Sequence, residues 1–62
     1  MQDMQATLEK LLTDAEDCEL ISKLATDLGK RATYGKLAAQ FRAMAEELQA
    51  EIRKRTAPSN TP

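Results

Sequence analysis

The fold is decided by residues 18–48, which read CELISKLATDLGKRATYGKLAAQFRAMAEEL. This stretch holds the end of one apolar stripe, a turn signal at Asp27 and Gly29, and the start of a second apolar stripe. In both stripes apolar residues recur every three or four positions, which matches the 3.6-residue period of an α-helix and not the two-residue period of a strand. The stretch therefore predicts two helices joined by a short connection.

The two helices are expected over about residues 3–25 and 30–55, with a turn over about residues 26–29. The first stripe consists of Met4, Leu8, Leu11, Leu12, Ala15, Cys18, Ile21, Leu24 and Ala25. The second consists of Tyr34, Leu37, Ala38, Phe41, Met44, Ala45, Leu48 and Ile52. Leu20 lies off the first stripe, either as an ordinary exposed leucine or as a second contact. A short connection makes the helices antiparallel neighbours.

The turn has two interpretations from local chemistry. Asp is a strong N-cap, so Asp27 could begin the second helix at once. Gly is a strong helix terminator, so Gly29 could end the first helix and leave Thr33 as the cap of the second. Residues 57–62 contain two prolines and no apolar pattern, so we expect a flexible tail after a hairpin that spans residues 1–56.

A chain of 62 residues buries little surface and is usually stabilised further by a disulfide, a structural metal or oligomerisation. Cys18 is the single cysteine and there is no histidine, which excludes an intrachain disulfide and a four-ligand zinc site. Both stripes are also wider than one neighbouring helix can cover. We therefore expect an all-α hairpin that pairs with a second copy as a four-helix bundle. Its core and dimer seam are predicted at Leu8, Leu11, Ala15, Cys18, Tyr34, Leu37, Ala38, Phe41, Ala45, Leu48 and Ile52.

Charge is distributed unevenly along the chain, although the net charge is −1. Residues 1–28 carry two basic and seven acidic side chains, and residues 29–62 carry seven basic and three acidic ones. Halves of opposite charge attract one another when they lie side by side. Arg31, Arg42 and Arg53 are spaced by eleven residues, close to three helical turns, so they line one edge of the second helix. They are expected to pair with Glu9 and Glu16; a phosphate-binding edge is the alternative.

Catalytic, metal and cofactor signals are weak in this sequence. A reactive thiol needs a lowered pKa, usually from a histidine or a helix N-terminus. Cys18 lies mid-helix on the apolar stripe, so it is read as a small buried residue. Asp14, Glu16 and Asp17 diverge from one exposed helix face and do not converge on a pocket. We expect no enzyme activity, no metal and no cofactor.

The expected location is the cytoplasm, with Cys18 as a reduced thiol. The first residues, Met1 to Met4, lack the basic start and apolar run of a signal peptide. No stretch approaches the length of a membrane span, and the polar face of the second helix mixes in Glu46, Glu47 and Glu51, so no membrane partner is expected.

The stretch from Cys18 to Leu48 resembles a group of short, uncharacterised α-proteobacterial helical-hairpin proteins. Their pattern begins C-x-x-L-A-x-x-A-[ST]-D-P-x-x-R, and the matching positions here are Cys18, Ile21, Ser22, Ala25, Thr26, Asp27, Arg31, Tyr34, Leu37, Ala38, Phe41, Met44 and Ala45. The family's D-P is typical of an N-cap followed by a first-turn proline, which favours Asp27 as the cap. This chain departs from the pattern with Leu28-Gly29 where the family has proline and its neighbour, so its second helix is expected to begin more loosely. The resemblance implies no activity.

The sequence thus predicts a non-enzymatic homodimer that acts through protein–protein contact, as an adaptor or regulator. The alternative is a small RNA- or DNA-binding regulator that uses Arg31, Arg42 and Arg53.

Overall fold

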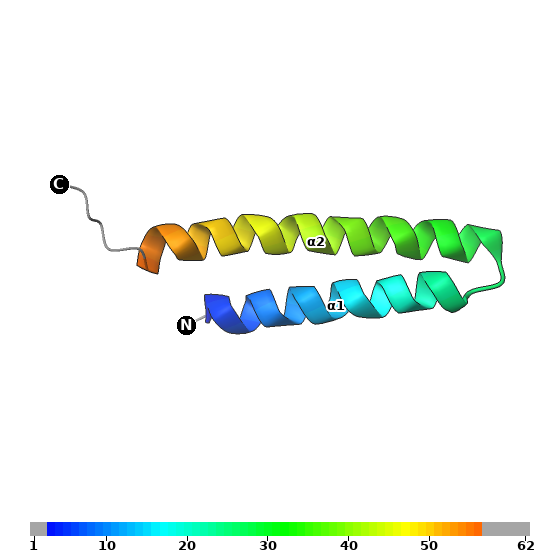
Figure 1. Cartoon of the computed structure of the whole chain (residues 1–62), viewed down its shortest axis with the longest axis horizontal. Coiled ribbons are helices and arrows are strands. Elements are labelled where there is room, and N and C mark those ends of the chain that lie inside the picture. The colour runs from blue at the N-terminus through cyan, green and yellow to red at the C-terminus, as the bar shows by residue number, and fades with distance from the viewer. Residues whose placement is uncertain (1–2, 57–62) are drawn as a thin grey trace.

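A computed structural model of the chain describes residues 3–56 and shows two helices packed side by side. Helix α1 spans Met4–Leu24 and helix α2 spans Leu28–Thr56. The helices run antiparallel, and the start of α1 lies at the same end of the hairpin as the end of α2 (Figure 1). The prediction of an all-α two-helix hairpin is confirmed. The flexible tail predicted over residues 57–62 lies outside the described residues.

Helix α1 is capped at its N-terminus by Asp3, whose carboxylate accepts a hydrogen bond of 3.0 Å from the backbone N–H of Gln5. This bond satisfies one of the orphan N–H groups of the first turn. The helix ends at Leu24, and Ala25 takes an extended conformation while its N–H still donates to the carbonyl of Ile21. Lys23 in the last turn complements the negative end of the helix dipole.

Asp27 is the N-cap of α2, as preferred from the sequence. Its Oδ1 accepts hydrogen bonds from the backbone N–H groups of Gly29, at 2.7 Å, and Lys30, at 3.3 Å. Gly29 and Thr33 both lie inside α2, and no described glycine has a positive φ, so the glycine-terminated alternative is wrong. The cap starts the second helix without the first-turn proline of the resembling family, which leaves a connection of only three residues between the helices.

The seam between the helices is made mainly of small side chains. Five apolar residues are buried in the described chain: Leu8, Ala15, Cys18, Ala38 and Ala45. Small residues at a helix contact let the two backbones approach closely. No described large side chain is fully buried, so the contact is close but the core of one hairpin is thin.

The closed end of the hairpin is tied by a side-chain bond between the helices. Ser22 on α1 donates from its Oγ to the backbone carbonyl of Arg31 on α2, at 2.8 Å. This bond fixes the end of α1 against the second turn of α2. Neither α1 nor α2 carries an apolar stretch long enough to cross a membrane, judged over residues 3–56.

Candidate functional site

The eleven residues predicted for the core and dimer seam divide into two groups in the single hairpin. The smaller side chains and Leu8 are buried between α1 and α2. The larger ones remain half-buried: Leu11, Tyr34, Leu37, Phe41, Leu48 and Ile52. The hairpin therefore covers its small residues and leaves much of its large apolar surface in contact with solvent.

The large apolar side chains of α2 lie on one side of its buried line. Ala38 and Ala45 face α1, and Leu37 and Met44 each precede one of them by one residue. Because successive helical residues are 100° apart, Leu37 and Met44 share a side that is displaced from the seam. We call this surface the apolar face, and it comprises Leu11, Ile21, Tyr34, Leu37, Phe41, Met44 and Leu48. Met44 and Ile21 are 44% and 42% exposed, so the apolar face is open in one chain.

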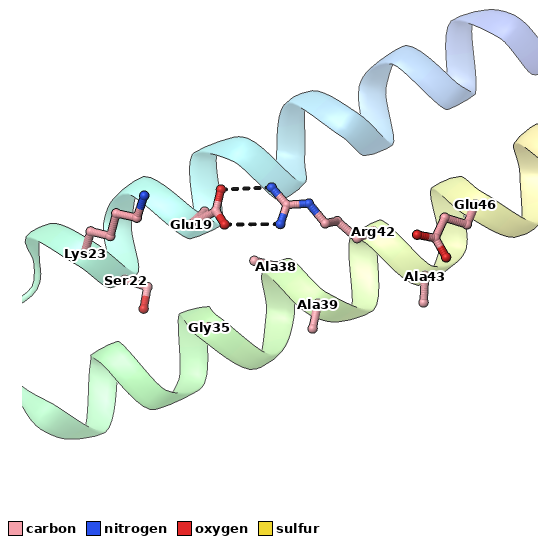
Figure 2. Close-up of a pocket in the computed structure, with 9 residues that line it drawn as sticks. All are labelled: Glu19, Ser22, Lys23, Gly35, Ala38, Ala39, Arg42, Ala43 and Glu46. Carbon is pink, nitrogen blue, oxygen red and sulfur yellow. Dashed lines mark hydrogen bonds and ion pairs between the residues drawn. The ribbon is translucent and has the colours of Figure 1, made fainter.

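The opposite side of the hairpin is an open groove of about 490 Å³ lined largely by small residues. We call it the small-residue groove, and its lining residues are drawn in Figure 2. Gly35, Ala39 and Ala43 on α2 form much of its floor. Lys23 and Glu46 border it from the two helices, so the groove carries charge at its rim and little apolar bulk at its base.

A bidentate ion pair between Glu19 and Arg42 crosses one wall of the groove (Figure 2). Arg42 donates from Nη1 to Oε2 at 3.1 Å and from Nη2 to Oε1 at 2.8 Å. These hydrogen bonds, together with the positive charge of Arg42, hold the pKa of Glu19 below its ordinary value, and the pKa of Arg42 is raised in return. The paired side chains link α1 to α2 on the surface.

This ion pair corrects the partner that we expected for the arginine edge, by which we mean Arg31, Arg42 and Arg53 on one side of α2. We expected Arg31, Arg42 and Arg53 to pair with Glu9 and Glu16, but the carboxylate that binds Arg42 is Glu19. Glu16 adds only a weaker charge attraction. Arg31 and Arg53 are exposed and form no ion pair with any residue of the described chain. Within the described residues, Arg42 is thus the arginine of this edge that is engaged in an ion pair, and the side chains of Arg31 and Arg53 are exposed to solvent.

A third exposed surface lies around the closed end of the hairpin. Leu20, Leu24 and Leu28 are 56%, 72% and 77% exposed. Leu24 was placed on the first stripe by its spacing, and the structure corrects this, because α1 ends there and α2 does not cover it. Leu20 and Leu24 are one helical turn apart on α1 and Leu28 begins α2, so the closed end of the hairpin carries three exposed leucines.

Groups that could perform chemistry are separated in the described structure. Cys18 is a free, buried thiol in the seam. No group of three or more Cys, Asp or Glu side chains is placed to hold a metal ion within residues 3–56.

Comparisons with protein-family models, with curated proteins and with solved structures find no match to this chain. The resemblance over Cys18–Leu48 therefore stays a prediction.

Proposed function

We propose that this protein is a non-enzymatic homodimer, a four-helix bundle of two hairpins that acts through protein–protein contact as an adaptor or regulator. The observation that supports the proposal is the apolar face. Leu37, Phe41 and Met44 project from one side of α2, and the hairpin itself leaves them partly exposed. The proposed location is the cytoplasm, where Cys18 would remain a thiol.

The energetics of a short chain favour pairing. Fully burying one large apolar side chain stabilises a fold by about 1.5–3 kcal/mol. The single hairpin nearly completes that burial for Leu8, which is 6% exposed, while its other buried residues are alanines and Cys18. Chains of this length rarely fold on so few buried groups and are usually stapled by disulfides, metals or oligomerisation. A second copy on the apolar face would supply the missing burial.

A pair of neighbouring substitutions tests the dimer. Met44→Asp places a charge on the apolar face, while Ala43→Asp places the same charge one residue away, on the groove side. We expect wild type and Ala43→Asp to have twice the chain mass of 6.9 kDa in light scattering. Met44→Asp should dissociate or lose helicity, because an unpaired charge would be desolvated. A folded wild-type monomer at micromolar concentration would contradict the proposal.

A protein partner would bind on the surfaces left outside the dimer contact. The small-residue groove is open in the hairpin, and Leu20, Leu24 and Leu28 are exposed near its closed end. Affinity capture from the native cytoplasm, read by mass spectrometry and a nucleic-acid stain, tests this part. A protein retained by wild type and lost from a Leu24→Asp or Ala39→Glu variant supports the adaptor or regulator role. Nucleic acid without protein would contradict it.

A second candidate function is nucleic-acid binding by the arginine edge. It is supported by the exposure of Arg31 and Arg53, which have no ion-pair partner in residues 3–56, and weakened by the engagement of Arg42 with Glu19. Phosphate contacts would make binding weaken steeply as salt rises. A salt-titrated gel shift should show that loss, and binding that persists with all three arginines changed to alanine would exclude the edge as its cause.

A further inference from the structure

The apolar positions of α2 are symmetric about the middle of the helix. Leu37, Phe41, Met44 and Leu48 are separated by four, three and four residues, so the spacing reads the same in both directions. Their midpoint falls between Arg42 and Ala43, and the midpoint of Leu28–Thr56 is Arg42 itself. A second copy of α2 laid antiparallel on this midpoint would therefore overlap the first along its whole length.

We propose that the second copy docks with α2 antiparallel against α2, so that the two turns lie at opposite ends of the bundle. The inference rests on the proposed homodimer and adds its helix pairing and direction. In this arrangement Leu37 lies at the level of Leu48 of the second copy, and Phe41 at the level of Met44 of the second copy. Each large side chain then meets another large side chain, as in knobs-into-holes packing of antiparallel helices.

The same register gives the hydroxyl of Tyr34, at the edge of the apolar face, a compatible neighbour in the second copy. Tyr34 lies three residues before Leu37, and Glu51 lies three residues after Leu48. They are therefore at equal distances from the midpoint, and Tyr34 faces Glu51 of the second copy. Both side chains are half-buried in the single hairpin. A phenol hydroxyl can donate to a carboxylate, so Tyr34 and Glu51 of the second copy can keep a hydrogen bond at the edge of the apolar face when water is excluded.

The opposite direction is less favourable by charge. Parallel α2 helices in register would place Lys30, Glu51 and Arg55 each at the level of the same residue in the second copy, which brings three pairs of like charges together. The antiparallel arrangement leaves two such approaches, Lys30 toward Arg55 of the second copy and its symmetry-related equivalent at the other end. Within each chain, Oε2 of Glu51 lies 3.6 Å from Nε of Arg55, so a carboxylate is present beside Arg55 to offset its repulsion with Lys30 of the second copy.

Stacking α1 over α2 of the second copy is also less favourable. The side of α1 that lies beside Leu37 and Met44 carries Thr7 and Asp14 together with Ile21, and these three recur every seven residues. Leu37 and Met44 would then cover a half-buried carboxylate that is 3.7 Å from Lys10 in its own helix. Covering that carboxylate with apolar side chains would desolvate it without supplying a hydrogen bond. Pairing α2 with α2 keeps the large apolar side chains together.

Distances between spin labels at the turn distinguish the arrangements. In a Cys18→Ala background, a single cysteine replaces Thr26, which is exposed in the connection, or Gln40, which is exposed near the midpoint of α2. Thr26 precedes the start of α2, which lies about 14 residues before the midpoint, so antiparallel pairing separates two Thr26 labels by roughly 40 Å at 1.5 Å per residue. Two Gln40 labels should be roughly 20 Å apart, because packed helices are about 10 Å apart.

The outcomes separate this inference from the dimer itself. A long Thr26 distance with a short Gln40 distance supports the antiparallel pairing. Short distances at both positions would show that the turns lie together, which overturns the antiparallel pairing and leaves the homodimer standing. A sample without dipolar coupling at either position, with the mass of a single chain, would overturn both. Circular dichroism of each labelled protein checks that the cysteine variants keep their helices.

Discussion

At the scale of single residues, two side chains hydrogen-bond to the backbone at the closed end of the hairpin. Asp27 starts α2 by accepting two backbone hydrogen bonds, and Ser22 ties α1 to the carbonyl of Arg31. Both are short polar side chains that bond to backbone groups, so their geometry leaves little freedom. They lie at the closed end, where the chain must reverse direction within three residues.

The Glu19–Arg42 pair predicts a dependence of stability on pH. The pKa of Glu19 is lower in the folded chain than its ordinary value of 4.5, so the pair stabilises the fold above pH 4.5 and this contribution is lost as the pH falls through the lowered pKa. Glu19→Gln should therefore unfold more readily than wild type at neutral pH, and the difference should shrink in acid. Thermal unfolding at a series of pH values measures it.

Glu9→Gln is the matched control for this pH dependence, because Glu9 is exposed on the same helix and forms no ion pair within the described residues. A Glu9→Gln variant should follow the wild-type pH profile more closely than Glu19→Gln does. Equal profiles for the two variants would show that the pair does not contribute in solution.

At the scale of the helices, α1 and α2 could be predicted from the sequence because each depends on local patterns. The three-to-four residue period and the Asp27 cap are readable without knowing what packs where. The sequence alone did not show which glutamate pairs with Arg42. Glu9, Glu16 and Glu19 lie on one helix, and the choice among them depends on how α1 and α2 are aligned and rotated, which the sequence does not state.

The small-residue groove was missed for a related reason. Gly35, Ala39 and Ala43 lie off the apolar stripe and read as ordinary helix residues. Their role as a groove floor becomes visible only when the side of α1 that faces them is known. The small character of Ala38 and Ala45, in contrast, was a usable signal for a close helix contact.

Gly35 offers a prediction at this scale. A Cβ added at Gly35 would lie 3.5 Å from the Oγ of Ser22, an ordinary contact distance. Alanine is favoured over glycine inside a helix by roughly 0.5–1 kcal/mol. Gly35→Ala should therefore raise the free energy of unfolding by about that amount in urea titrations. Gly29→Ala is the control with a smaller expected gain, because its Cβ would lie 3.2 Å from the capping oxygen of Asp27.

At the scale of the whole molecule, the hairpin has faces of different character. One face carries large apolar side chains, the other carries a groove of small residues crossed by an ion pair, and the closed end carries exposed leucines. A bundle built on the first face would leave the other two free. This division separates the residues that hold the proposed dimer from those that could bind something else.

A homodimer predicts that thermal stability depends on protein concentration. Association stabilises the folded state by mass action, so the midpoint of unfolding should rise as wild-type protein is concentrated. Phe41→Asp should unfold the chain, because it introduces a charge into the part of the apolar face that lies beside the seam. Circular dichroism melts over a hundredfold range of concentration measure both effects. A midpoint that is independent of concentration would argue for a stable single hairpin.

The three-residue connection between Leu24 and Leu28 has a kinetic consequence. Short loops close in about 10–100 ns, and contacts between helices adjacent in the chain cost little loop-closure entropy. The meeting of α1 with α2 is therefore a fast, first-order event. If two hairpins must then find each other, their encounter sets the pace of refolding in dilute solution. Newly made chains would thus mature faster where many of them are made together.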